Sequence, residues 1–183
     1  IKNDVKTLTE FGTRNTFSDT ISKTRGIGAA RRWIKSEFEN ISKTCNSCLN
    51  VFYQKDFVTT DMGSRIPKDA WVVNVVAVQK GTKYPNRYII MSGDIDSRAS
   101  DTMDFTTDAP GANDNASGMA GTIEAARVLS KDNCLLFTSF AMATALYNLP
   151  ILAILNNASG LALICWLRSC QPLTSVLGTS PSL

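Results

Sequence analysis

The sequence contains no histidine in its 183 residues. Imidazole is the usual base beside a serine or cysteine nucleophile, the usual proton carrier near neutral pH and the commonest zinc ligand. Its absence excludes every nucleophile pair that depends on histidine and every metal site built on imidazole nitrogen. Any catalysis or metal binding by this chain must therefore rest on other side chains.

Charge is unevenly distributed, and one part of the chain has almost none. The 19 Lys and Arg and the 16 Asp and Glu give a formal net charge of +3 without a basic stretch, so no nucleic-acid partner is expected. After Cys134 the sole charged side chain is Arg168. Solvated surfaces normally carry charge throughout. We therefore divide the sequence into residues 1–140 and an uncharged tail, residues 141–183.

An apolar stripe with helical spacing runs through residues 25–43. Its members are spaced by three or four residues: Ile27, Ala30, Ile34, Phe38 and Ile41. This spacing predicts a helix that packs on a sheet. The charged residues beside the stripe are expected on the solvated side of that helix, and they are Arg31, Arg32, Lys35, Glu37 and Glu39.

Cys45 and Cys48 form a C-x-x-C motif. A structural zinc site needs four ligands, and the sequence offers neither histidine nor a second cysteine pair at suitable spacing. A local disulfide in an exported protein is therefore favoured over a zinc site or free thiols. The other cysteines lie in apolar surroundings typical of small core residues: Cys134, Cys165 and Cys170.

Two strand-forming runs precede an acidic loop. Residues 71–79 and 87–93 are rich in β-branched and apolar side chains, and the turn between them predicts two neighbouring strands. Asp94 and Asp96 follow the second run, where a buried strand ends. Ligands of open α/β sheets bind at this end of the strands, so these carboxylates are candidate site residues.

A third acidic residue, Asp114, lies in a turn before a predicted helix. The inward stripe of that helix is Met119, Ile123, Ala126 and Leu129. Asn115 or Ser117 can cap its amino end, and by local pattern alone Asp114 is an ordinary turn aspartate. Residues 134–140 predict another strand, and the order strand, strand, helix, strand indicates an α/β sandwich around a mixed sheet.

The run from residue 74 to residue 131 closely resembles the two-zinc aminopeptidase family of bacterial leucyl aminopeptidases and plasma glutamate carboxypeptidase. The most specific phrases are GANDNASG at 111–118 and EAARVL at 124–129, and with the earlier FGTRNT, GIGAARRWI and CNSCL the resemblance covers about residues 5–140. It implies the amino-terminal part of a mixed-sheet α/β/α sandwich, truncated here. It also implies hydrolysis of amino-terminal peptide bonds in a peptide substrate, at an extracellular or periplasmic location.

The resemblance implies a site in which two zinc ions share a bridging aspartate and a water molecule, beside a carboxylate base. Asp114 matches the bridging aspartate. Asp96 matches the acid of the family's H-x-D motif, which orients the site, and Asp94 stands at the histidine of that motif. The expected metal ligands are thus Asp94 and Asp114, the expected catalytic residue is Asp96, and the expected cofactor is zinc.

Other positions depart from the family. Met142 and Ala143 stand where a Glu-Glu pair supplies the base and a ligand, Ala158 stands at a further ligand aspartate, and the last histidine ligand is absent. Loss of the base alone removes roughly 10²–10⁴ in rate. We therefore expect weak or no zinc binding and no peptidase activity. The alternative is a non-catalytic relative that binds a peptide or protein, or a fragment without function.

Three interpretations of residues 141–183 remain open: a decayed core, a change of reading frame near Phe140, and a membrane segment at residues 151–167. The membrane interpretation is the least favoured, because the segment contains Asn156 and Asn157 and its 17 residues are at the lower limit for a span. A sheet that lacks its remaining strands exposes an edge and apolar surface, which predicts marginal stability or self-association.

Overall fold

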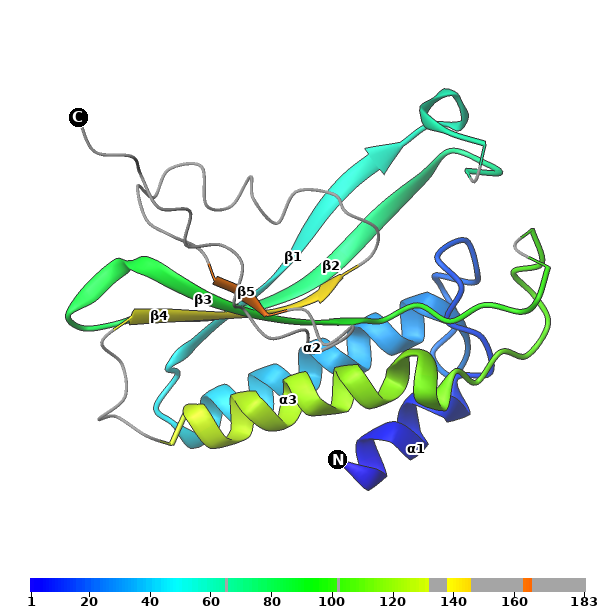
Figure 1. Ribbon diagram of the computed structural model, residues 1–183. Coiled ribbons are helices and arrows are strands. Elements are labelled where there is room, and N and C mark those ends of the chain that lie inside the picture. The colour runs from blue at the N-terminus through cyan, green and yellow to red at the C-terminus, as the bar shows by residue number, and fades with distance from the viewer. Residues whose placement is uncertain (65, 102, 132–137, 146–162, 166–183) are drawn as a thin grey trace, which may run out of the picture.

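The computed structural model describes residues 1–64, 66–101, 103–131, 138–145 and 163–165, the last two segments as backbone only. Its α-helices lie together on one face of a five-stranded sheet (Figure 1). The mixed α/β class expected from the sequence is confirmed. The elements described include one of the two helical layers of an α/β/α sandwich.

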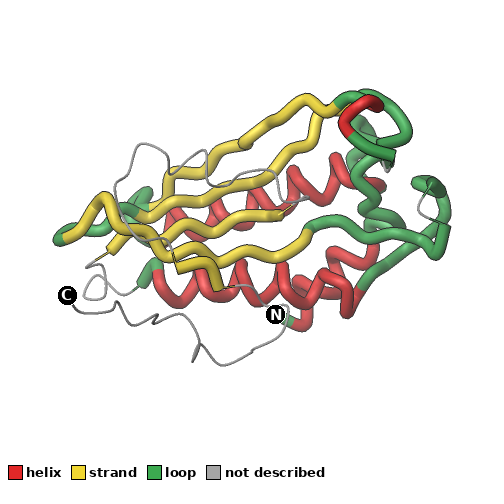
Figure 2. The backbone as a smooth tube through the Cα atoms, turned by 45° about the horizontal axis from the view of Figure 1, so that its top comes forward, coloured by secondary structure: helices red, strands yellow, loops and turns green. Residues whose placement is uncertain are grey.

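The strands are β1 (Leu49–Val58), β2 (Ala70–Gln79), β3 (Tyr84–Asp94), β4 (Thr138–Ala145) and β5 (Leu163–Cys165). Their order across the sheet is β1-β2-β4-β3-β5. β1 and β2 form an antiparallel hairpin paired over the whole length of both strands, and β4 and β5 run parallel to β3. The sheet is therefore mixed, as expected (Figure 2).

The helices are α1 (Lys2–Glu10), α2 (Gly26–Thr44) and α3 (Ser117–Leu129). A single 3-10 turn, η1, occupies Thr60–Met62, and a π-type turn, η2, occupies Ala112–Ala116 directly before α3. α2 packs on β1 and β2, α3 packs on β3 and β4, and α1 lies against α3 and η2. The α1 helix thus covers the start of α3 rather than the sheet.

The expectation that the strands at 71–79 and 87–93 are neighbours is wrong. β4 lies between β2 and β3, antiparallel to β2 and parallel to β3. β2 is buried almost throughout, so it needs a partner strand at each edge. A strand that follows α3 can be that partner, and its return to the sheet also packs α3 on the sheet. Part of the strand expected at 134–140 is confirmed, since β4 begins at Thr138.

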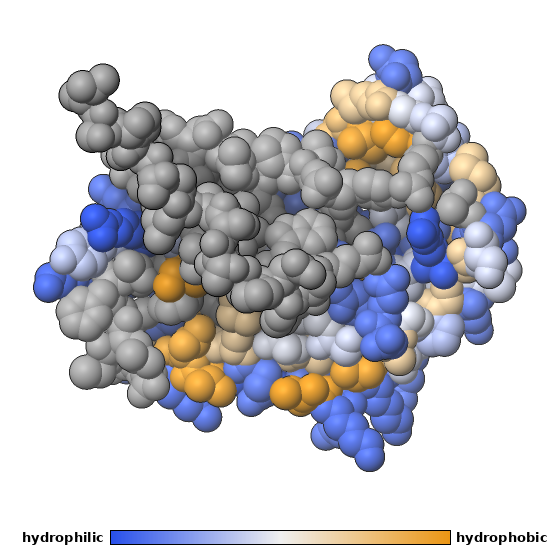
Figure 3. Space-filling model, in the orientation of Figure 1, coloured by the Kyte–Doolittle hydropathy of each residue, from blue (hydrophilic) through white to orange (hydrophobic). Residues whose placement is uncertain are grey.

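Among the helices and strands, α1, β1 and β5 have no counterpart in the sequence analysis. β1 lacks a regular alternation of apolar and polar residues. It becomes recognisable as a strand through its pairing, from Leu49 opposite Gln79 to Val58 opposite Ala70. The hairpin extends beyond the helices and carries exposed apolar side chains, including Phe57 and Trp71, whose ring centroids lie 5.2 Å apart (Figures 1 and 3). Self-association through such surface stays a prediction.

The core lies between the sheet and the helices, and both predicted apolar stripes contribute to it. Ile27, Ala30, Ile34 and Phe38 of α2 are fully enclosed, as are Met119, Ile123 and Ala126 of α3. One assignment on α2 was wrong: Arg31 is only 7% exposed and does not lie on the solvated side. It is one turn from Ile27 on the helix surface, so its side chain starts beside the apolar stripe.

A disulfide joins Cys45 and Cys48 between α2 and β1, with Cα atoms 5.4 Å apart, and this confirms the favoured interpretation of the C-x-x-C motif. Within the described residues, every helix is too short or too polar to be a membrane span. Most of the segment considered for a membrane helix, residues 151–162 and 166–167, lies outside the described part, as do Cys134 and Cys170.

Candidate functional site

The end of β3 and the start of α3 bring three aspartates together. Asp94 is the last residue of β3, Asp96 follows two residues later, and Asp114 lies in η2, whose turn packs against both β3 and α3. The sequence analysis named these residues separately, and the structure assembles them at one end of the sheet. Their roles as metal ligands and catalytic residue stay predictions.

Glycines allow this close approach of the two segments. Gly111 has a φ of +51°, and a Cβ atom there would lie 2.6 Å from both the carbonyl oxygen of Asp114 and the Cβ of Ser97. A Cβ atom on Gly93 would lie 2.8 Å from the carbonyl carbon of Gly118 in the first turn of α3. Any larger residue at either position would push the aspartate-bearing turn away from β3.

The amino end of α3 is capped as the sequence suggested. The side-chain oxygen of Asn115 accepts a hydrogen bond from the backbone nitrogen of Gly118 at 2.7 Å, and the hydroxyl of Ser117 donates to the carbonyl of Asn113 at 3.0 Å. The peptide bond between Asp114 and Asn115 is cis. These contacts fix the backbone on both sides of Asp114.

The three carboxylates repel one another. Burial raises the pKa of Asp96 to about 6, and the negative charges of Asp94 and Asp114 act in the same direction, against a smaller opposing effect of Arg14. A carboxyl group with so high a pKa is typical of a site that takes a cation or a reacting group.

Arg14 is a cation that acts on Asp96 of this cluster, and it is fully buried. Its guanidinium donates hydrogen bonds to four carbonyl oxygens, those of Leu8, Ile95, Pro110 and Gly111, at 2.6 to 3.0 Å. Burial lowers the pKa of Arg14 to about 10. Because its donors are used on the backbone, Arg14 joins the loops on either side of the cluster but forms no ion pair with it.

The sequence analysis gave Arg14 no role. Its partners lie 81 to 97 positions away in the sequence, apart from Leu8, so no local pattern reveals them. Ser97 strengthens the same junction, since its hydroxyl accepts from the Arg14 backbone nitrogen at 3.0 Å and donates to the carbonyl of Ala109. The signal in the sequence that could have drawn attention to Arg14 is the phrase FGTRNT, which contains it and belongs to the family resemblance.

The donors present do not fit a pair of zinc ions. Four ligands per ion is the usual requirement, and nitrogen or sulfur donors are preferred, whereas this cluster offers three carboxylates at most. Within the described residues, no group of three or more His, Cys, Asp or Glu has the arrangement of a metal site. The aspartates could contact a single cation but not hold two.

Positions expected to carry further ligands add nothing. Met142 lies opposite Met91 of β3 and Ala143 lies opposite Ser92, three and two positions before Ala145, which pairs with Asp94. Neither residue type offers the oxygen or nitrogen donor that a Glu-Glu pair would bring. Ala158 lies outside the described residues.

Comparison with known proteins finds similar sequences. Residues 74–142 match the model of peptidase family M28. A probable zinc metalloprotease of Leptosphaeria maculans is 45% identical over 124 residues, which are 68% of this chain and 28% of that protein. A probable zinc metalloprotease of Pyrenophora teres f. teres is 44% identical over 131 residues, 72% of this chain and 27% of the relative. The chain thus spans little more than a quarter of these relatives.

Solved structures share the fold. The LapA aminopeptidase of Legionella pneumophila superimposes with a TM-score of 0.54 at 20% identity over 78% of this chain and 32% of its own. A glutaminyl cyclase of Tannerella forsythia gives 0.57 at 16% identity over 78% of this chain and 44% of its own. These likenesses concern the fold alone. By sequence, residues 74–142 are thus similar to peptidase family M28, and the wider chain is similar to probable zinc metalloproteases.

Proposed function

We propose that these 183 residues are a catalytically depleted member of family M28, derived from a zinc-dependent aminopeptidase. Asp94 and Asp114 are the remaining metal contacts, and Asp96 is the acid that oriented the original site. The observation that carries the proposal is the cluster itself: three carboxylates meet at the end of β3, where Asp94 and Asp114 help to raise the pKa of Asp96, in a chain without histidine and with Met142 and Ala143 at the Glu-Glu positions. Zinc would bind weakly here, and peptide hydrolysis would lack its base.

A second candidate function is peptide binding without hydrolysis. The negative charge left in the cluster is complementary to a positively charged group, and the free amino end of a peptide carries one at neutral pH. The matched relatives are named probable zinc metalloproteases, which supports a peptide as the ligand class. In this interpretation the aspartates hold the amino end that the active enzymes would process.

Zinc titration by calorimetry, combined with hydrolysis of a chromogenic leucyl amide, tests depletion. We expect weak zinc binding and no turnover that a chelator abolishes. Asp114→Asn should remove the remaining zinc signal, whereas Asp108→Asn, an exposed aspartate in the preceding loop, should not. Two tightly bound zinc ions per chain with chelator-sensitive turnover would overturn the proposal. A leucyl dipeptide that binds without being cleaved, and that Asp96→Asn releases, would favour the second candidate.

We also propose that the protein works outside the reducing cytosol, in an extracellular or periplasmic compartment. The Cys45–Cys48 disulfide supports this, because such bonds persist in oxidising surroundings. Mass spectrometry of protein from its native source, alkylated before and after reduction, would detect the bond. Two alkylated thiols at these positions without prior reduction would contradict the proposal.

A further inference from the structure

Arg31 of α2 is a buried cation without an acidic partner. Its residue is 7% exposed, and its Nε donates to the carbonyl of Ile27, one turn earlier, at 3.3 Å. No other hydrogen bond and no ion pair of Arg31 occurs in the part of the chain that the structure describes. The terminal nitrogens are thus available as donors.

These donors are not sealed inside the protein. In the described residues, the enclosed side-chain nitrogen and oxygen atoms that lack a hydrogen bond belong to Thr16 and Gln79. The terminal nitrogens of Arg31 are not among them, so they must reach solvent through a small opening. A guanidinium held in a largely apolar setting is costly unless an anion accepts its hydrogen bonds.

The adjacent strand supplies a second unused donor. Tyr53 of β1 is half-buried where α2 packs on the strand, and its hydroxyl has no hydrogen-bond partner among the described residues. The hydroxyl lies within electrostatic reach of Arg31, and Lys35 and Lys55 flank its ring with Nζ atoms 5.6 and 6.0 Å from the centroid. Arg31 is one turn before Lys35 on α2, and Lys35 reaches the Tyr53 ring, so the guanidinium and the phenol belong to the same junction of α2 and β1.

The surrounding charge is predominantly positive. Four cations gather at this junction of α2 and β1: Arg31, Arg32, Lys35 and Lys55. Two acids oppose them, since Glu39 pairs with Lys35 and Asp19 acts on Arg32. The guanidinium of Arg32 also donates hydrogen bonds to the carbonyls of residues 20–22, and these bonds hold its positive charge at the junction. The junction keeps two positive charges in excess.

We propose that Arg31 and Tyr53 form a binding site for a doubly charged oxyanion, such as phosphate or sulfate, at the junction of α2 and β1. The guanidinium provides two parallel N–H donors, the geometry that matches phosphate oxygens, and the phenol provides a third donor. A divalent anion balances the excess charge, whereas acetate or chloride would leave part of it. The site is separate from the aspartate cluster and does not depend on its chemistry.

Calorimetric titration of the 183-residue protein with inorganic phosphate, at constant ionic strength, tests the proposal. We expect saturable one-site binding, with sulfate competing and acetate at the same ionic strength binding much more weakly. Arg31→Met should weaken phosphate at least about tenfold, because a charge-assisted pair is lost. Tyr53→Phe should weaken it about two- to tenfold through one hydrogen bond.

Lys43→Met is the matched control, since it removes one positive charge from an exposed residue in the last turn of the same helix. It should leave phosphate affinity unchanged. If Arg31→Met does not give a cooperative unfolding transition, Tyr53→Phe decides, because the ring and its packing are retained. Equal weakening in Lys43→Met, or no saturable phosphate binding by the wild type, would overturn the site.

A phosphate group could also arrive on a lipid. Co-sedimentation with phosphatidylcholine vesicles, with and without phosphatidic acid, distinguishes this source. Binding of the free ion without vesicle binding supports a soluble ligand, and vesicle binding that requires both phosphatidic acid and Arg31 supports the same site with a lipid headgroup. Vesicle binding that persists in Arg31→Met would count against it.

Discussion

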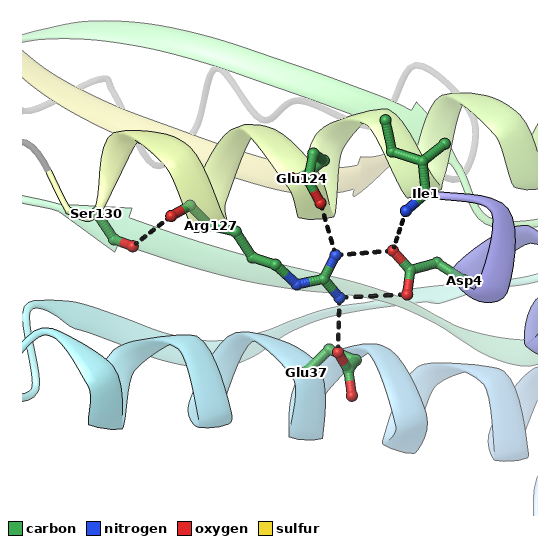
Figure 4. Close-up of polar contacts among 6 residues, drawn as sticks. All are labelled: Ile1, Asp4, Glu37, Glu124, Arg127 and Ser130. Atoms are coloured by element: carbon green, nitrogen blue, oxygen red, sulfur yellow. Dashed lines mark hydrogen bonds and ion pairs between the residues drawn. The ribbon is translucent and has the colours of Figure 1, made fainter.

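Two clusters in this molecule each combine three carboxylates with one arginine, and their electrostatics are opposite. Between the helices, Arg127 of α3 contacts Asp4 of α1, Glu37 of α2 and Glu124 of α3 at 2.8 to 2.9 Å (Figure 4). At the end of β3, the guanidinium of Arg14 donates its hydrogen bonds to carbonyl oxygens, and three aspartates lie near one another. The first cluster is held by ion pairs, whereas in the second the neighbouring aspartates help to raise the pKa of Asp96.

The pKa values express this difference. Burial alone would raise the pKa of Asp4, but Arg127 and the amino group of Ile1 lower it below its ordinary value. For Asp96, burial and like charges raise the pKa to about 6. Carboxylates that pair with a cation stabilise the folded chain. Buried carboxylates that repel one another lower its stability, and such groups are typical of functional sites. The comparison separates an ionic joint between helices from a cluster that we propose to be the remainder of a metal site.

The largest expected effect is at Arg14. Arg14→Met would leave the buried carbonyl oxygens of Leu8 and Ile95 and the part-buried ones of Pro110 and Gly111 without this donor, which should cost about 3–4 kcal/mol of the free energy of unfolding. Urea denaturation followed by circular dichroism measures it. Arg98→Met, at an exposed arginine in the same loop region, is the control and should change little. A loss below about 1 kcal/mol would show that Arg14 does not hold these loops together.

Removing the arginine of the other cluster should have a smaller effect. Arg127→Met removes the arginine from the buried Asp4 and the half-buried Glu37, and leaves the amino group of Ile1 as the remaining cation beside Asp4. Loss of one partner of a fully buried pair costs about 3–5 kcal/mol, and since the Arg127 side chain is 28% exposed we expect about 2 kcal/mol. Arg127→Lys should recover part of this loss in the same urea experiment. An unchanged midpoint for Arg127→Met would mean that the helices do not depend on the joint.

Neutralising one acid in each cluster should change stability in opposite directions. In chelator, Asp96→Asn removes a repelled charge and should raise the free energy of unfolding by up to about 1 kcal/mol. Asp4→Asn removes a charge that Arg127 stabilises and should lower it by about 1–2 kcal/mol. Thermal unfolding of both variants beside the wild type gives the two signs. Destabilisation by Asp96→Asn would show that the aspartate cluster is structurally neutralised after all.

The smallest effect is the acid sensitivity of the helix joint. Because the folded-state pKa of Asp4 lies below the ordinary value of 3.8, its stabilising contribution is complete above that value and is lost as the pH falls through the lowered pKa. The stability difference between wild type and Asp4→Asn should therefore be constant near neutral pH and shrink in strong acid. Urea midpoints across this range measure it, and a difference that grows on acidification would contradict the assignment.

Elements with strong local patterns could be predicted from the sequence. The stripes of α2 and α3, the buried run of β2 and the cap at Asn115 all follow from the spacing of residues near one another in the chain. The strand order could not be predicted in this way. β4 lies between β2 and β3, which were expected to pair with each other. Which strand occupies this position depends on the apolar surface that it buries together with α3, and no local pattern reports that.

The aspartates of the site could be found because they follow a strand and precede a helix, positions with a recognisable pattern. The arginines could not. Arg14 binds carbonyl oxygens of loops that are distant in the sequence, so no local pattern indicates its role. Arg31 was assigned to the solvated side because a charged residue beside an apolar stripe usually lies there, but it is buried. Burial of a long cationic side chain is decided by what packs beside it, here β1, which the sequence analysis did not identify.

The position of β4 also has a consequence for synthesis on the ribosome. The hairpin of β1 and β2 can close as soon as residue 79 has emerged, but both strands that pair with β3 come much later, at Thr138–Ala145 and Leu163–Cys165. For more than 40 residues of elongation, the nascent chain carries an apolar strand with two bare edges. The interval before β4 emerges is thus when a chaperone has most to protect.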